Sequence, residues 1–161
     1  MRYHTKSELL GKNQEFLEFF RGFTDGEGSF SINQIGESNF QFAFKIRLHL
    51  DDKDVLIFIQ KSLGVGQVRT YGNSTIFVIS NLKDLQIIID IFSQTSLNTT
   101  KHLNFLALAQ AFWLYHISEK SVRRERLKDI RLEIANIKSS MNNSRTYFVM
   151  PSSHKFIINP H

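Results

Sequence analysis

The segment Phe19–Phe30 (FFRGFTDGEGSF) holds the residues best suited to chemistry. Gly22 and Gly26 are four residues apart, so on a helix they share one face and let a second helix approach closely. Glu27 follows at the expected C-terminal end of that helix, beside carbonyl oxygens that have no intrahelical partner. A carboxylate next to free carbonyls is a hard-oxygen site suited to Mg²⁺. The alternative on spacing alone is a glycine-rich turn that carries an exposed acid.

A helix over Asn13–Asp25 must position these residues. Its apolar side chains recur at the spacing of one helix face, and Asn13 is a suitable N-cap. The glycines at 26 and 28 are expected to end it. The apolar positions are Phe16, Phe19, Phe20 and Phe23.

The rest of the chain predicts an α+β domain with the order αββαββα, followed by two C-terminal helices. Residues 39–50 alternate between two sides, which is typical of a sheet with one buried and one open face. Asn39, Gln41, Ala43, Lys45, Arg47 and His49 take the open side, and Phe40, Phe42, Phe44, Ile46, Leu48 and Leu50 take the buried side. Helices are expected to cover the apolar face. The predicted strands are Ser29–Ile35, Asn39–Leu50, Gln67–Tyr71 and Thr75–Ser80, and the predicted helices are Asp52–Leu63, Leu82–Phe92, Leu103–Ile117 and Val122–Ser140.

The open face of this sheet is a candidate nucleic-acid surface. Its expected outward positions hold hydrogen-bond donors, acceptors and cations of the kinds that contact base edges and phosphates, and they hold no acid. An ordinary solvated face is the alternative. The expected DNA-binding residues are Ser29, Ser31, Asn33, Gln41, Lys45, Arg47, Gln67, Arg69, Tyr71 and Thr75.

Composition limits the classes of function. The chain has 161 residues, a net charge of +5 and no cysteine, which excludes disulfides, thiolate zinc sites and a cysteine nucleophile. No apolar run approaches the ~20 residues of a membrane span. A basic domain of this size favours nucleic acid as its partner, because phosphate contacts reward clustered Lys and Arg.

The segment Phe20–Gly28 resembles the LAGLIDADG motif in its form L-A-G-F-x-D-G-E-G, followed by Ser29-Phe30. Further stretches are similar to the same family of homing endonucleases at the expected distances. These stretches are Phe44–Asp54, Leu63–Gly66, Leu82–Leu85, Leu97–Lys101 and Gln110–Phe112. The resemblance implies a saddle-shaped antiparallel sheet and covers nearly the whole chain.

The resemblance also implies a mechanism. Two motif helices pack side by side, here through Phe19, Gly22, Phe23 and Gly26, and the sheets lie in the major groove of double-stranded DNA. Glu27 and Gly26 would hold Mg²⁺, or another divalent ion such as Mn²⁺ or Ca²⁺, for cleavage across the minor groove. Lys101 is the nearest match to a basic catalytic residue, whereas Asp25 is expected to be a structural residue at the helix end.

Two departures from the family pattern favour half of a two-motif enzyme over a homodimer. Leu48 stands where a glutamine is common, and Asn98 and Thr99 occupy the vicinity of the basic residue. A homodimer would lose both groups twice, whereas a second, different half could supply them. Phe156–His161 is similar to the lead-in to another motif helix. We therefore expect an endonuclease domain at residues 1–145 and an extension or linker at residues 146–161.

Two other functions stay open at this point. Members of this family sometimes act as maturases that help group I intron RNA to splice, and Glu27 would then be dispensable. An inert remnant that retains only the fold is the third option. The resemblance further suggests a product encoded in the mitochondrion, with no membrane association.

Overall fold

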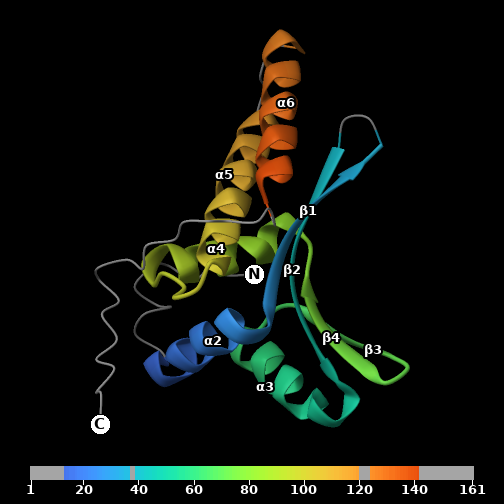
Figure 1. Ribbon diagram of the computed structural model, residues 1–161, viewed down its shortest axis with the longest axis vertical. Coiled ribbons are helices and arrows are strands. Elements are labelled where there is room, and N and C mark those ends of the chain that lie inside the picture. Colours follow the sequence, from blue (N-terminus) through green and yellow to red (C-terminus); the bar gives the residue numbers. More distant parts are fainter. Residues whose placement is uncertain (1–12, 37–38, 120–123, 142–161) are drawn as a thin grey trace.

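The computed structural model describes residues 13–36, 39–119 and 124–141 (Figure 1). The predicted extension at residues 146–161, including Phe156–His161, lies outside the described residues. The α+β class and the element order are confirmed, with element ends within about two residues of the expected ones in nearly every case. The helices are α2 (Gln14–Glu27), α3 (Lys53–Leu63), α4 (Leu82–Gln94), α5 (Lys101–Glu119) and α6 (Arg124–Ser140); the strands are β1 (Gly28–Ile35), β2 (Asn39–His49), β3 (Gln67–Tyr71) and β4 (Ser74–Ile79).

The four strands form one antiparallel sheet in the order β1-β2-β4-β3. Helices α2, α3, α4 and α5 lie on one side of the sheet, and its two hairpins project away from them (Figure 1). The divergence of the hairpins curves the sheet, so the face turned away from these helices is hollowed. The helices therefore bury one face and leave the other uncovered by these helices.

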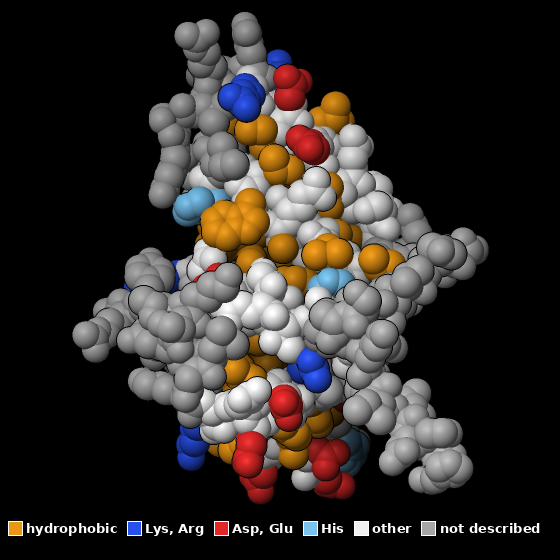
Figure 2. Space-filling view, turned by 90° about the vertical axis from the view of Figure 1, so that its left-hand side faces the viewer, with side chains coloured by type: hydrophobic (Ala, Val, Ile, Leu, Met, Phe, Trp, Pro, Cys, Tyr) orange, Lys and Arg blue, Asp and Glu red, His pale blue; other side chains and the backbone are white. Residues whose placement is uncertain are grey.

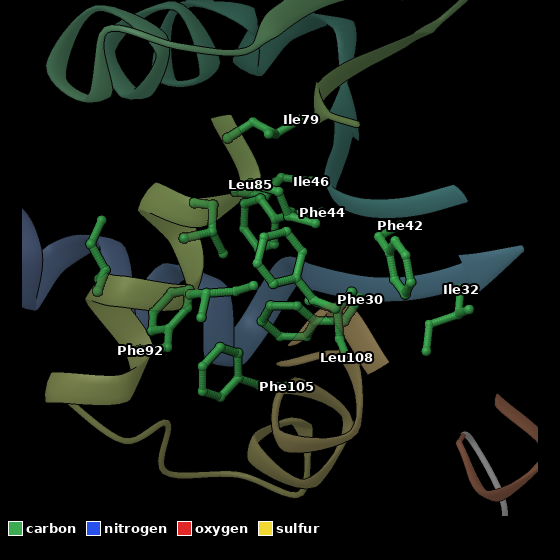
Figure 3. Close-up of a cluster of buried hydrophobic side chains, with 14 of the residues drawn as sticks. Phe30, Ile32, Phe42, Phe44, Ile46, Ile79, Leu85, Phe92, Phe105 and Leu108 are labelled. Carbon is green, nitrogen blue, oxygen red and sulfur yellow. The ribbon is translucent and has the colours of Figure 1, made fainter. Parts of the chain in front are cut away.

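Phenylalanine rings dominate the core between sheet and helices (Figure 3). Phe30 and Phe44 come from neighbouring strands and pack with their ring centroids 5.3 Å apart. Both also contact Phe92 of α4, and Phe30 contacts Phe105 of α5. Offset and edge-to-face ring pairs add stability beyond the area that they bury. This cluster joins α4 and α5 to the strand that follows α2.

Two side-chain positions differ from the sequence-based expectation. Thr75 was expected on the open face, but it is buried on the helix side, where its hydroxyl donates to the Arg69 carbonyl at 3.4 Å. The two-residue turn at 72–73 pairs Tyr71 with Ser74, so the next residue of β4 points to the opposite face. Leu50 was expected inside but is 37% exposed, because β2 ends at His49 and a short 3₁₀ turn follows.

The helical side of the molecule exposes apolar side chains in the half that α5 and α6 occupy (Figure 2). Leu106 and Trp113 of α5 and Leu132 of α6 are among the exposed apolar residues. Even so, no helix in the described ranges combines the length and the hydropathy needed to cross a bilayer.

Candidate active site

Helix α2 ends in the residues that carry the candidate chemistry. Its N-terminus is fixed by Asn13, whose side-chain oxygen accepts from the Phe16 N–H at 3.1 Å. Phe16, Phe20 and Thr24 form the buried face. The helix continues two residues beyond the predicted end, so Glu27 is its last residue. Gly28 caps it, with its N–H donating to the Thr24 carbonyl.

Asp25 anchors the end of α2 to the segment that precedes α5. Its carboxylate accepts from the backbone N–H of Asn98 at 2.9 and 3.0 Å and from that of Thr99 at 2.9 Å. The Thr99 hydroxyl donates to the same carboxylate at 2.8 Å. These contacts agree with the expected structural role of Asp25. They also bring Lys101, the next residue but one after Thr99, close to the motif.

Lys101 reaches the last carbonyls of α2. Its Nζ donates to the Gly26 oxygen at 2.9 Å and to the Thr24 oxygen at 3.5 Å. Burial lowers the pKa of Lys101 below its ordinary value, while the charges of Glu27 and Asp25 oppose this shift. A cation is favoured at a helix C-terminus, and the last turn of α2 contains no basic residue of its own. Lys101 supplies that charge from another helix.

Glu27 is exposed beside this lysine, and within the described part of the chain it has no hydrogen-bond or ion-pair partner. Its carboxylate and the Gly26 carbonyl are oxygen ligands of the type that Mg²⁺ prefers. The Gly26 oxygen already accepts from Lys101 but keeps a second lone pair. No cluster of three metal-binding side chains occurs among the described residues. The Glu27 and Gly26 oxygens therefore fit part of a Mg²⁺ coordination shell, which water, phosphate or a second protein module would complete.

The other side of α2 is open, as the glycine spacing predicts. A Cβ built at Gly22 or Gly26 meets nothing within 4 Å. Phe19 is 41% exposed on this side, with Phe23 partly buried beside it at a centroid distance of 5.4 Å. These are the four residues expected at the helix interface: Phe19, Gly22 and Gly26 are exposed, and Phe23 packs partly buried against the core.

Phe58 of α3 extends this surface and was missed by the sequence analysis. It is 51% exposed, and its ring lies 5.8 Å from that of Phe16 and 5.9 Å from that of Phe19. A weak signal was present in the sequence: Val55, Leu56, Ile59 and Leu63 have the spacing of one helix face, and Phe58 falls outside that set. A single exposed aromatic residue is common, and only its contact with Phe19 in the structure makes Phe58 part of a larger apolar surface.

Nine of the ten predicted DNA-binding residues lie on the hollowed face of the sheet, and Thr75 is the exception. No acidic residue lies in any of the four strands. Most of the nine are exposed, whereas Ser31 is half-buried. The same face includes Ala43, as expected, and the apolar residues Ile76 and Val78, which the sequence analysis did not assign to it. A shallow hollow there is lined by Asn33, Gln41, Ala43, Lys45, Arg69, Tyr71, Ile76, Val78 and Ser80.

Leu48, the residue in the place of the family glutamine, points to the other side of the sheet. It pairs with Thr75 across the strands and packs partly buried against the core. It therefore brings no polar group to the candidate site.

The comparisons with known proteins point to one family. Residues 20–112, more than half of the chain, match the family model described as LAGLIDADG endonuclease. The chain belongs to the LAGLIDADG endonuclease family. The matched range begins in the motif helix and extends into α5, so it includes Glu27, Lys101 and all four strands.

Individual LAGLIDADG relatives are longer than this chain. A probable intron-encoded endonuclease, Cox1-I1b of Schizosaccharomyces pombe, is 30% identical over 131 residues, which are 76% of this chain and 34% of that protein. The uncharacterized mitochondrial protein RF1 of Saccharomyces cerevisiae is 27% identical over 139 residues, which cover 85% and 27%, respectively. The chain thus spans about a third or less of these two relatives.

A solved LAGLIDADG homing endonuclease, I-GzeII in complex with its DNA target, has a similar fold. It is 29% identical, with a TM-score of 0.72 over 78% of this chain and 44% of that one. The fold of the present chain therefore corresponds to a little under half of that enzyme.

Proposed function

We propose that this chain is one module of a site-specific endonuclease that cleaves double-stranded DNA in intron homing. The proposal depends above all on one observation: Lys101 lies close enough to Glu27, at the end of the motif helix, for the two charges to interact. The basic, acid-free sheet face supports it, since DNA binding depends on phosphate neutralisation and base-edge contacts. The intron-encoded relative and the DNA-bound neighbour favour the same function.

Each residue of the site has a separate proposed role. Glu27 and the Gly26 carbonyl would hold Mg²⁺, or Mn²⁺ or Ca²⁺ in its place. When bound, such an ion activates water and stabilises negative charge on the phosphate. Lys101 places a positive charge beside the same carboxylate, where it can contact the scissile phosphate. Asp25 keeps the start of α5 against α2, so the lysine is held in position.

A complete enzyme needs a second module. One Glu27 serves one strand, and cutting both strands across the minor groove requires a matching acid on the other side. The open face formed by Phe19, Gly22, Phe23 and Gly26 suits a second motif helix, because glycines let two helix backbones approach closely. Either a second copy of this chain or a different half of a longer protein would supply it.

The maturase alternative is not favoured, because the Cox1-I1b relative and the DNA-bound I-GzeII are described as endonucleases. The RF1 relative is described only as uncharacterized. The names of the relatives also support an organelle-encoded product, and we propose the mitochondrion as its compartment.

The test is a Glu27→Gln substitution in this chain fused to a second LAGLIDADG half that retains the groups that this chain lacks. Duplexes that join a site selected by this chain to the half-site of the second half would be incubated with Mg²⁺. We expect cleavage to fall by more than about 100-fold, with DNA affinity nearly unchanged, because the amide keeps the size but loses the metal-binding charge.

Glu133→Gln on α6 is the matched control, since this acid is exposed on a helix outside the proposed site. Cleavage that persists in the Glu27→Gln fusion would contradict the assigned role of Glu27. Absence of any salt-dependent DNA binding by the unmodified chain would contradict the proposed function as a whole.

A further inference from the structure

Strand β3 contains a side-chain pair, Arg69 and Gln67, to which the proposed function gives no separate role. Arg69 and Gln67 are two residues apart, so both point to the hollowed face. The Arg69 Nε donates to the Gln67 Oε1 at 3.1 Å, and its Nη2 donates to the same oxygen. This double contact fixes the plane of the guanidinium group. The restriction reduces the side-chain entropy that a later contact would cost.

The pairing leaves the recognition end of Arg69 unused. A guanidinium group has five N–H donors, and Gln67 takes one on Nε and one on Nη2. Two donors on Nη1 and one on Nη2 remain, and they form a fork at the tip of the side chain. Because Gln67 is neutral, the pair also keeps the full positive charge of the arginine.

The surroundings of Arg69 offer this fork no competing acid. Its cross-strand neighbour is Ile76, which is apolar. Asp84 lines an adjoining hollow together with Arg69, but its carboxylate accepts from the Asn81 side chain at 2.7 Å. No ion pair of Arg69 occurs among the described residues. The fork therefore remains available to an acceptor from outside the chain.

Arg47 on β2 is the natural comparison. It pairs with Ile76 from the other side, so Arg47, Ile76 and Arg69 form one row across three strands. Within the described part of the chain, no side chain holds the Arg47 guanidinium. The two arginines thus share charge, face and row but differ in whether their orientation is fixed.

We propose that Arg69 reads a guanine in the major groove and that Gln67 is the positioning residue that orients it. This inference rests on the proposed DNA-binding function. An arginine fork matches the O6 and N7 acceptors of guanine, which lie side by side on the major-groove edge. A fixed fork also suits a phosphate, but Arg69 lies on the hollowed sheet face that we expect to meet base edges. For Arg47, whose guanidinium group is not held by a side chain of the described residues, we expect a less specific phosphate contact.

The experiment is a selection from randomised duplexes with the full wild-type chain, which defines the preferred sequence. The same selection is then repeated with Arg69→Ala, Gln67→Ala and Arg47→Ala. We expect the wild type to require guanine at one position, by roughly 5- to 150-fold over other bases. Arg69→Ala should abolish that single requirement. Gln67→Ala should weaken it while the salt dependence of binding stays the same, since no charge is lost.

A chemical probe tests the geometry of the contact. Replacing that guanine by 7-deazaguanine removes N7 and should weaken binding by the wild type but not by Arg69→Ala. Replacing it by inosine keeps O6 and N7 and should leave binding by the wild type unchanged. Arg47→Ala should lower affinity for all sequences and reduce the salt slope by about one, with the guanine requirement intact.

The outcomes separate this inference from the proposed function. Salt-dependent binding without a guanine requirement that depends on Arg69 would overturn the inference and leave the proposed function standing. An unchanged requirement in Gln67→Ala would overturn the role of Gln67. If the wild type showed no DNA binding at all, the proposed function itself would be overturned.

Discussion

Asp25 and Glu27 show how two carboxylates in one motif acquire different roles. They are separated by one residue at the end of α2, yet Asp25 is surrounded by donors from residues 98 and 99. Glu27 is the last residue of the helix and is exposed. A carboxylate that accepts several hydrogen bonds is committed to the fold, since its removal leaves those donors unsatisfied. A carboxylate without partners is free to bind a ligand.

Substitution of the two acids should separate stability from activity. We expect Asp25→Ala to reduce the free energy of unfolding by about 2–3 kcal/mol, because backbone donors lose their charged acceptor. Glu27→Gln should change it by less than about 0.5 kcal/mol, as is usual for exposed positions. Urea unfolding followed by circular dichroism measures both. Equal losses for the two variants would contradict this assignment.

The pKa of Lys101 provides a second test at the level of residues. Burial lowers it from the ordinary value of 10.5, and Glu27 partly restores it. The folded protein therefore releases this proton before the unfolded chain does, so this group adds stability as the pH rises towards 10.5. In Glu27→Gln the opposing charge is gone, and the pKa of Lys101 should fall further.

The titration can be followed by NMR of the labelled lysine side chains. Glu133→Gln is the control, and it should leave the pKa of Lys101 as in the wild type. A pKa of Lys101 that is insensitive to Glu27→Gln would show that the two side chains do not interact.

The helices and strands themselves follow closely from the sequence, because most have a clear apolar period and a glycine, asparagine or short turn at one end. Where the apolar pattern is ambiguous, the sequence decides less. In β4 both faces hold apolar residues, so polarity alone placed Thr75 outward. The pairing of Tyr71 with Ser74 across the two-residue turn instead places Thr75 on the buried face.

The candidate site was predictable only in part, since its local and its long-range contacts leave different traces in the sequence. Glu27 and the two glycines lie within one short motif and were found from it. The contacts of Asp25 and Lys101 join residues more than 70 positions apart. No local pattern encodes such contacts, and only the family resemblance pointed to Lys101.

The connection between α3 and β3 should be an element boundary that is sensitive to substitution. Gly66 has a φ of +92°, and a Cβ there would lie 2.6 Å from the Phe77 Cζ. Gly66→Ala should therefore cost about 2–4 kcal/mol, from the backbone conformation and from overpacking. Gly64→Ala is the matched control, because Gly64 has a φ of +74° but open space around it. Its expected cost is about 1–2 kcal/mol.

Thermal unfolding of the two variants measures this difference. Because β3 carries Arg69, the Gly66 variant should also bind DNA less selectively than the Gly64 variant. Equal stability of the two variants would contradict the contact between residue 66 and the Phe77 ring.

On the scale of the whole molecule, the described residues present two surfaces of different chemistry. The hollowed sheet face is polar and basic, whereas the open face of α2 is aromatic and notched by glycine. The two surfaces meet near Glu27, because β1 starts at the residue that caps α2. A second module on the α2 face would therefore bring its own acid close to Glu27 and continue the DNA-binding surface. Neither surface alone would define an endonuclease.

Gly22→Ala tests this division, because it should stabilise the single chain and weaken its association. Alanine in a helix interior is favoured over glycine by about 0.5–1 kcal/mol, and the new methyl group meets nothing within 4 Å. The same methyl group would hold a second motif helix away from α2. Urea unfolding should show the gain in stability, and sedimentation on selected duplexes should show fewer complexes with two modules. Asn136→Ala on α6 is the control, since it improves helix propensity on an exposed position away from the α2 face. If Gly22→Ala associated as well as this control, the α2 face would not be the contact between modules, and the acid of the second strand would have to come from elsewhere.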